Sequence, residues 1–219
     1  MISQTEENYL KAIFKLSEKN GKKVSTNAIA GQLNMAAASV TDMVKRLAEK
    51  KLVSYQKYRG VNLTEEGKSA ATNIIRKHRL WEVFLVKKLQ FHWDEVHEIA
   101  EQLEHIKSNI LTDRMDDFLG YPKFDPHGDP IPDRDGKIVY HKELTLSKHK
   151  EGESGIVVAV DDHTSLFLQY LDKIKLGLNT EVKVVDSTPF DNSKTLVFSD
   201  GKEITVSEKV CENLLVKKL

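Results

Sequence analysis

Residues 24–64 decide the fold of this chain: VSTNAIAGQLNMAAASVTDMVKRLAEKKLVSYQKYRGVNLT. The stretch begins with a short helix that Ser25 or Thr26 can cap, because a side-chain oxygen there accepts a hydrogen bond from the first helical turn. Asn34-Met35 predicts a turn. A longer helix follows from about Ala37 to Lys50, because its apolar residues recur at helical spacing and form one buried face: Val40, Met43, Val44 and Leu47.

Two short strands, Leu52–Gln56 and Val61–Leu63, end this stretch around a turn at Arg59-Gly60. Upstream, residues 5–18 predict a first helix with one apolar face. Three helices followed by a β-hairpin are the layout of a winged helix-turn-helix, whose third helix enters the major groove of DNA. We therefore expect residues 1–64 to bind double-stranded DNA.

The predicted DNA contacts are polar residues on the helices and the hairpin tip of this domain. The third helix carries short polar groups, which can reach base edges, and then basic groups, which suit phosphates. Asp42 would repel the DNA backbone unless it accepts a hydrogen bond from a cytosine amino group. The hairpin tip adds cations and an aromatic ring. The candidate residues are Thr5, Thr26, Asn27, Ser39, Thr41, Asp42, Lys45, Arg46, Tyr58 and Arg59.

The charge distribution agrees with a nucleic-acid partner for the first domain. The whole chain has a formal net charge of zero, but residues 1–60 carry 11 Lys+Arg against 5 Asp+Glu, a net charge of +6. The rest therefore carries −6, so the basic excess lies on the predicted DNA-binding domain. A solvated charged surface, or a winged helix used only for protein contacts, is the alternative interpretation.

Composition and length limit the remaining possibilities. With 219 residues the chain has room for more than one domain, and 40% hydrophobic with 30% charged residues is typical of a soluble protein. No apolar run approaches the roughly 20 residues of a membrane span, and the N-terminus lacks the layout of a signal peptide. The single Cys211 excludes an internal disulfide. We expect a cytoplasmic protein without a membrane partner.

Helices are predicted for residues 65–120. Thr64 can cap a long helix that continues to about Gln90, and Asp94 begins a helix whose apolar positions extend to Ile110. A further helical piece, Leu111–Leu119, ends at Gly120. These helices carry more apolar surface than a winged helix can cover, so we expect them to form a homodimer interface.

The predicted secondary structure changes from helices to a proline-rich stretch and strands after residue 120. Residues 121–142 contain four of the five prolines and predict a structured or tethering linker. Residues 143–219 then predict a small SH3-like β-barrel with one helix at about Thr164–Asp172 and these strands: Leu144–Leu146, Gly155–Val160, Glu181–Val185, Thr195–Phe198 and Glu203–Val206. The predicted fold class is α+β, mainly α.

Metal-ligating side chains concentrate in the helical region. In the run HEIAEQLEH, four such side chains share one helical face, namely His97, Glu101, Glu104 and His105. His78 and Glu82 repeat the i, i+4 spacing one helix earlier. That spacing directs two donors toward one ion, as in metal sites on helix bundles. A hydrated polar face with ordinary histidines is the alternative.

The chain resembles the metal-dependent repressors of the diphtheria toxin repressor type, including the manganese transport regulators. The resemblance covers nearly the whole sequence. It rests on NYLKAIFKL, SVTDMVKRL, YRGVNLTEEG, RKHRLWE, VHEIAEQLEH and DPHGDPIP, followed by a C-terminal region similar to the FeoA-type SH3 domain of the longer members.

The resemblance implies two neighbouring metal sites in each subunit. The primary site would use Asn8, Glu101, Glu104 and His105. The ancillary site would use His78, Glu82 and His97, with His163 as the nearest match to a donor from the SH3-like domain and Asp161 or Asp162 as substitutes.

Three positions, compared with those of the family, bear on the metal. Glu101 stands where iron-type regulators have a cysteine, and a hard carboxylate suits Mn²⁺ or Fe²⁺. Asn8 replaces the aspartate of manganese-type members, and Lys11 replaces a carboxylate found in some of them. We expect Mn²⁺ first and Fe²⁺ second, with Zn²⁺, Ni²⁺ or Co²⁺ able to bind in vitro.

The sequence therefore predicts a homodimeric, metal-activated transcriptional repressor of metal-ion homeostasis genes that binds palindromic operators, without catalytic residues or a small-molecule substrate. Two rivals follow from the same residues. A metallohydrolase is disfavoured because the run lacks the HExxH order and an evident general base. The other alternative is a metal-independent winged-helix regulator whose ligands no longer bind an ion. The neutral side chain of Asn8 is the residue that suggests it.

Overall fold

The computed structural model describes residues 2–20, 23–56, 59–140 and 142–219. The chain divides into two compact units that interleave in sequence. The first unit comprises Met1–His78, Glu101–Asp113 and Pro132–Ile138, and the second comprises Arg79–Ala100, Arg114–Ile131 and Val139–Leu219.

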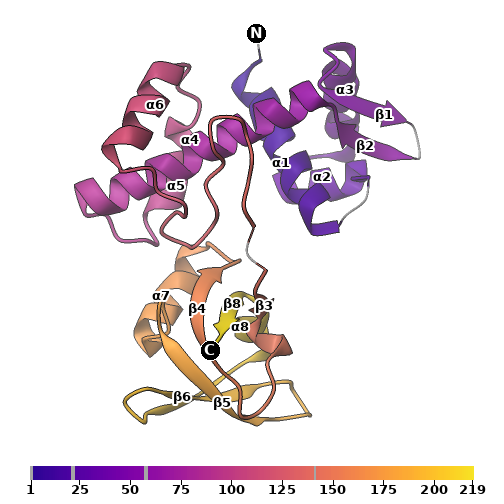
Figure 1. Cartoon of the computed structure of the whole chain (residues 1–219). Coiled ribbons are helices and arrows are strands. Elements are labelled where there is room, and N and C mark those ends of the chain that lie inside the picture. Colours follow the sequence, from indigo (N-terminus) through magenta and orange to yellow (C-terminus); the bar gives the residue numbers. More distant parts are fainter. Residues whose placement is uncertain (1, 21–22, 57–58, 141) are drawn as a thin grey trace. The chain divides into compact units, whose positions relative to one another are not determined.

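The first unit contains the predicted winged helix-turn-helix (Figure 1). Its elements, in chain order, are α1 (Gln4–Asn20), α2 (Thr26–Leu33), α3 (Ala37–Glu49), β1 (Val53–Gln56), β2 (Gly60–Leu63) and the beginning of α4 (Glu65–Leu89). Both predicted caps are confirmed. The Ser25 hydroxyl accepts a hydrogen bond from the Ala28 amide at 3.1 Å, and that of Thr64 accepts one from the Gly67 amide, also at 3.1 Å.

The core of the first unit is formed by the apolar faces of these helices, as their spacing predicts. Fully buried side chains come from α1, α2, α3, the hairpin and α4, among them Leu10, Ile13, Ile29, Val40, Val44, Leu47, Val61 and Ile74. Val24 bridges Val61 through two backbone hydrogen bonds, of 3.0 and 2.8 Å, and so extends the hairpin. This packing fixes α3 against α1 and α2.

The helix that follows α4 is shorter than predicted. Asp94 was expected to begin one helix reaching Ile110, and this prediction is wrong: α5 (Val96–Leu103) ends before Glu104, and α6 (Asn109–Phe118) is a separate helix. Ser108 accepts a hydrogen bond from the Leu111 amide at 3.2 Å and so begins α6. Glu104 and His105 consequently lie in a turn rather than on a helix.

The proline-rich stretch is structured where it passes through the second unit. The Asp125 side chain accepts hydrogen bonds from the amides of His127, at 2.8 Å, and Asp129, at 3.0 Å, which fold DPHGD into a tight turn. Gly128 has φ +89°, and a Cβ there would lie 2.2 Å from the carbonyl oxygen of Val158. The turn therefore needs glycine to lie against the strand that contains Val158.

The second unit is built on one antiparallel sheet with the order β3-β8-β4-β5-β6-β7. Its strands are β3 (Leu144–Thr145), β4 (Ser154–Val160), β5 (Glu181–Ser187), β6 (Lys194–Phe198), β7 (Glu203–Val206) and β8 (Leu214–Lys218). The predicted helix is α7 (Ser165–Ile174), while Leu146–Lys148 forms a 3₁₀ turn rather than strand. Two elements were not predicted, the helix α8 (Glu208–Glu212) and the strand β8, which lies inside the sheet between β3 and β4.

The core of this sheet is mainly aliphatic, with α7 packed against it through Phe167, Leu168 and Leu171. Cys211 is buried in the same core, and burial raises its thiol pKa to about 11. None of the described helices is long and apolar enough to cross a membrane.

Candidate metal centre

In the first unit, the predicted ligands Glu101 and Glu104 surround an ammonium group. Lys11, on α1, donates from Nζ to Glu101 Oε1 at 2.6 Å and to the two oxygens of Glu104 at 2.7 and 2.8 Å. Glu104 is completely buried and Lys11 is nearly so. The two carboxylates therefore hold a cation at this position.

Two histidines of the first unit, His105 and His78, each pair with a carboxylate of this region. His105 Nδ1 lies 2.7 Å from Glu7 Oε2, and His78 Nδ1 lies 2.6 Å from Glu104 Oε2. A second buried lysine, Lys77, is close enough to Glu7 and Glu104 to interact with both carboxylates. Burial lowers the pKa of Lys77, against the opposing effect of the Glu7 and Glu104 carboxylates. The region thus collects acidic, basic and imidazole groups away from water.

Asn8 supplies the observation that favours a metal ligand. Its side-chain oxygen is buried and accepts no hydrogen bond from the described residues. Asn8 follows Glu7 directly and precedes Lys11 by three positions on α1, so its two neighbours on that helix both contact the 101–105 segment. A buried oxygen without a donor is costly, and coordination to an ion would satisfy it.

The donor types in this set suit a hard divalent cation. Two carboxylates, an amide oxygen and an imidazole are ligands that Mn²⁺ and Fe²⁺ accept, and no thiolate is among them. The donor types of Asn8, Glu101, Glu104 and His105 therefore fit the predicted primary site. Whether these four bind an ion together stays a prediction.

The second unit contains another cluster of ligating side chains. Ligand atoms of Glu82, Asp125 and His127 lie within 4.8 Å of one another, and all three residues are buried. Glu82 Oε1 is also 3.2 Å from His97 Nδ1, and its other oxygen is 3.7 Å from His127 Nδ1. The His163 ring stacks on that of His127 with centroids 4.5 Å apart.

Two ligand atoms in this cluster have no hydrogen-bond partner among the described residues. They are Asp125 Oδ2 and His127 Nδ1. Burial lowers the pKa of His127, but the Glu82 and Asp125 carboxylates outweigh it and raise that pKa to about 9. Burial, together with repulsion from Glu82 and Asp129, raises the pKa of Asp125 well above its usual range. Arg79 Nε lies 3.6 Å from Asp125 Oδ2, so the charge of the cluster is already balanced in part within the chain. The two ligand atoms without a hydrogen-bond partner are the observation that favours an ion here.

Sequence reasoning missed Asp125 and His127. Both belong to the motif DPHGDPIP, which we had interpreted as part of a linker. The predicted ancillary ligands are distributed differently: Glu82, His97 and His163 are in the second unit, whereas His78 is in the first. The grouping of His78 with Glu82 and His97 in one site stays a prediction. Of the suggested substitutes, Asp161 is exposed, and Asp162 accepts a hydrogen bond from the Thr164 amide at 2.9 Å.

The predicted DNA contacts lie on the winged helix-turn-helix. Asp42 pairs with Lys45 at 3.5 Å on the exposed face of α3, so its carboxylate lies beside a cation of the same helix. The Thr41 hydroxyl donates to the Ala37 carbonyl at 2.9 Å, so its oxygen is left as an acceptor. Exposed side chains complete the set: Thr5, Asn27, Ser39, Arg46 and Arg59, with Thr26 half-buried. Tyr58 lies outside the described residues.

Comparison with protein families divides the chain into three matched regions. Residues 1–61 match the iron dependent repressor N-terminal DNA binding domain, and residues 64–133 match the iron dependent repressor metal binding and dimerisation domain. Residues 144–218 match the FeoA domain.

Individual relatives span the whole chain. The iron-dependent repressor IdeR of Mycobacterium tuberculosis is 27% identical over 228 residues, which cover 100% of this chain and 99% of that protein. A solved manganese-dependent transcriptional repressor in complex with manganese is 34% identical, has a TM-score of 0.90, and the match covers 97% of this chain and 99% of that one. The structure of the manganese regulator SloR is 34% identical, with a TM-score of 0.79 and full coverage of both chains.

Proposed function

The chain belongs to the iron-dependent repressor family, and from this premise we propose that it is an Mn²⁺-activated repressor that binds palindromic operator DNA as a homodimer. Proteins of this family are metal-dependent transcriptional repressors, not enzymes. The metallohydrolase interpretation is thereby set aside.

The observation that carries the proposal is the contact between α1 and the 101–105 segment. The helix α1 belongs to the region matched to the DNA-binding domain, and residues 101–105 belong to the region matched to the metal-binding and dimerisation domain. Within the first unit, Lys11 bonds Glu101 and Glu104, and Glu7 bonds His105. The candidate ligands therefore lie where one matched region meets the other.

Asn8, Glu101, Glu104 and His105 would hold the ion. When bound, a divalent cation supplies a double positive charge between the two segments. Asn8 would hold the ion from α1, and the buried carboxylate of Glu104 would hold it from the turn after α5. Because α1 packs with α2 and α3 in one core, holding α1 also sets the orientation of α3, the predicted recognition helix.

Binding at this set and binding of DNA should favour the same arrangement, so each should strengthen the other. Coupling free energies of this kind are typically about 1–3 kcal/mol, or roughly 5- to 150-fold in affinity. We propose Glu82, Asp125 and His127, flanked by His97 and His163, as a second ion set that stabilises the second unit.

Mn²⁺ is preferred over Fe²⁺ because Glu101 stands where the iron-type regulators that this chain resembles have a cysteine. Similar proteins support both ions. The solved relative at 34% identity is described as manganese-dependent, and the IdeR relative at 27% identity as iron-dependent. Fe²⁺ therefore stays the alternative activating ion.

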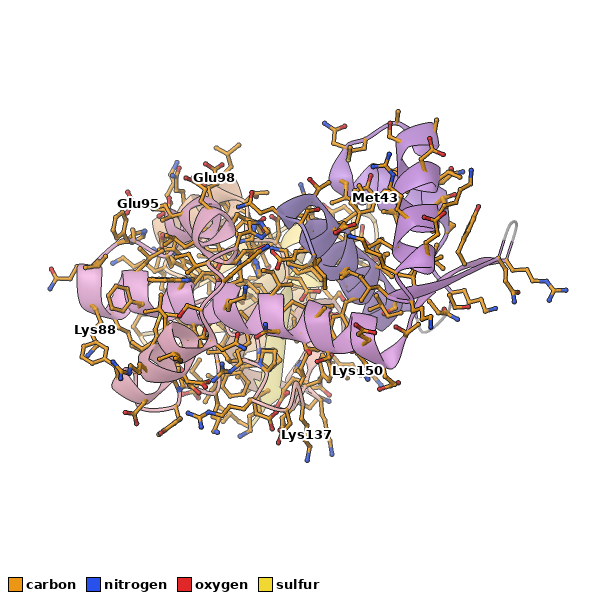
Figure 2. All side chains as sticks on the ribbon, turned by 90° about the horizontal axis from the view of Figure 1, so that it is seen from above. Met43, Lys88, Glu95, Glu98, Lys137 and Lys150 are labelled. Carbon is orange, nitrogen blue, oxygen red and sulfur yellow. The ribbon has the colours of Figure 1, made fainter. Side chains whose placement is uncertain are left out.

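An exposed apolar surface in the second unit supports dimerisation. Phe118 on α6 is 61% exposed and Leu89 at the end of α4 is 53% exposed. The Phe84 and Phe118 rings have centroids 6.4 Å apart, and Lys88, labelled in Figure 2, lies with Nζ 4.7 Å from the Phe118 centroid. Large apolar groups that stay exposed in one chain suit a symmetric contact with a second copy.

The test is operator binding by the full-length protein, measured by fluorescence anisotropy after chelation and after addition of Mn²⁺ or Fe²⁺. We expect tight binding only with the ion, with Glu104→Gln losing the metal response. Glu98→Gln is the matched control, because Glu98 is an exposed carboxylate on α5 (Figure 2). Operator binding that is equally tight in chelator, or a full metal response in Glu104→Gln, would overturn the proposal.

A further inference from the structure

Lys11 bonds two of the carboxylates that the candidate ion set would use to hold a metal. It is buried on α1, and its ammonium makes three hydrogen bonds, at 2.6 Å to Glu101 Oε1 and at 2.7 and 2.8 Å to the oxygens of Glu104. A lysine ammonium has three donors and no acceptor, so these three contacts account for its full donor capacity. Both carboxylates are thus already neutralised in part by a group of the chain itself.

The same carboxylate oxygens are needed by a divalent ion. An ammonium and a metal ion cannot both lie within bonding distance of one small group of oxygens, because their positive charges repel strongly in a buried site. A buried carboxylate such as Glu104 also cannot stay unpaired without a large cost. Binding of a metal ion therefore requires the Lys11 ammonium to move away from Glu101 and Glu104. Loss of the ion allows the ammonium to bond these two carboxylates again.

We propose that Lys11 is an internal competitor of the metal ion, which weakens divalent-cation binding at the Asn8, Glu101, Glu104 and His105 set. This inference rests on the proposed function, because it assumes that this set binds the activating ion. Its consequence is a raised threshold concentration of metal. The two carboxylates contribute −2 and Lys11 contributes +1, while Asn8 adds no charge to offset the lysine.

The competitor also has a role without metal. By bonding Glu101 and Glu104, Lys11 ties α1 to the 101–105 segment in the metal-free protein. The ion would then replace an existing cation rather than fill a gap. Removal of the lysine charge should therefore tighten metal binding and, at the same time, destabilise the metal-free protein, and a merely structural lysine would not give the first of these effects.

The experiment is isothermal titration of MnCl₂ into the chelated full-length protein. The variant is Lys11→Met, which keeps the length of the side chain and removes its charge. The matched control is Lys107→Met, because Lys107 is an exposed lysine of the same unit whose Nζ donates to the Ile2 carbonyl at 2.9 Å. All proteins carry His127→Asn, which disables the second-unit set.

We expect Lys11→Met to bind Mn²⁺ at least tenfold more tightly, which corresponds to about 1.4 kcal/mol, and Lys107→Met to change affinity less than twofold. If circular dichroism shows that Lys11→Met is unfolded without metal, Lys11→Gln, whose amide can still donate to one carboxylate, takes its place with the same expectation. Unchanged or weaker Mn²⁺ binding in the folded variant overturns the proposal, as does an equal gain in Lys107→Met.

This outcome is separable from failure of the proposed function. Glu104→Gln tests whether the set activates operator binding at all. If Glu104→Gln loses its metal response but Lys11→Met leaves Mn²⁺ affinity unchanged, the competition proposal alone fails. If Glu104→Gln keeps its full response, the proposed function fails first.

Discussion

Restoring a carboxylate at position 8 should convert a weak ion set into a strong one. The Asn8 side-chain oxygen is buried and has no donor among the described residues, and the Lys11–Glu101–Glu104 cluster begins one helical turn further along α1. The two glutamates and Lys11 together carry a formal charge of −1, and Asn8→Asp would make it −2. The added charge lies where a divalent ion would gain most from it.

The size of the effect follows from Coulomb's law and from the cost of burial. A single negative charge about 4 Å from a doubly charged ion contributes about 8 kcal/mol at an effective dielectric constant near 20. Burying the new carboxylate costs several kcal/mol. We expect a net gain of about 1.5–3 kcal/mol, which is roughly 10- to 100-fold tighter Mn²⁺ binding.

The assay is a calorimetric titration of MnCl₂ into chelated Asn8→Asp and wild-type protein. Asn27→Asp is the matched control, because it adds the same charge at an exposed position on α2. Without metal, we expect Asn8→Asp to unfold at lower urea concentration than the wild type, since the new carboxylate is then buried near two others. Mn²⁺ affinity equal to that of the wild type, in a folded Asn8→Asp protein, would refute the assignment of Asn8 as a ligand.

Three further predictions concern other parts of the chain. His127→Asn should reduce the number of bound Mn²⁺ ions from two to one per chain by calorimetry, and an unchanged stoichiometry would exclude the second-unit set. Gly67→Ala should cost at least about 2 kcal/mol in urea unfolding, because a Cβ there would lie 1.9 Å from the Leu52 carbonyl oxygen; a loss below about 0.5 kcal/mol would contradict this. The Asp94 carboxylate accepts a hydrogen bond from His92 Nδ1 and so raises the pKa of His92. The stabilising effect of this pair should therefore be complete below pH about 6.5 and lost as the pH rises through the raised value. An NMR titration of His92 should show this raised pKa, and a value at or below 6.5 would show the pairing to be absent in solution.

The winged helix-turn-helix could be predicted from sequence because its signals are local. Ser25 and Thr64 cap their helices as predicted, and Val40, Val44 and Leu47 face the core. Each of these depends on residues within one or two helical turns.

The turn after α5 could not be predicted in the same way. Ile106 and Ile110 continue the helical period, yet the helix ends at Leu103, and both isoleucines are exposed. The side chains of Glu104 and His105 instead bond Lys11 and Glu7, which are more than 90 positions away in the sequence. A local pattern carries no information on such contacts, although Ser108 was a readable start signal for α6.

In the candidate ion sets, too, residues at local helical spacing could be predicted, and residues brought together by the fold could not. Carboxylates and histidines at helical spacing pointed to residues 97–105, but Asp125 and His127 have no helical period and lie among prolines. Their convergence with Glu82 depends on the folded DPHGD turn, and hence on Gly128 lying against the carbonyl of Val158. The sequence showed that Lys11 replaces a carboxylate, but only the structure places its ammonium between Glu101 and Glu104.

We infer that metal and DNA favour the same arrangement of α1 and the 101–105 segment, and this coupling acts in both directions. Its most direct test is the Mn²⁺ affinity of the full-length protein, measured by calorimetry with and without operator DNA. Linkage requires that DNA tighten Mn²⁺ binding by the same factor by which Mn²⁺ tightens DNA binding, and we predict a factor between about 5 and 150. An Mn²⁺ affinity that is the same with and without operator would contradict the account.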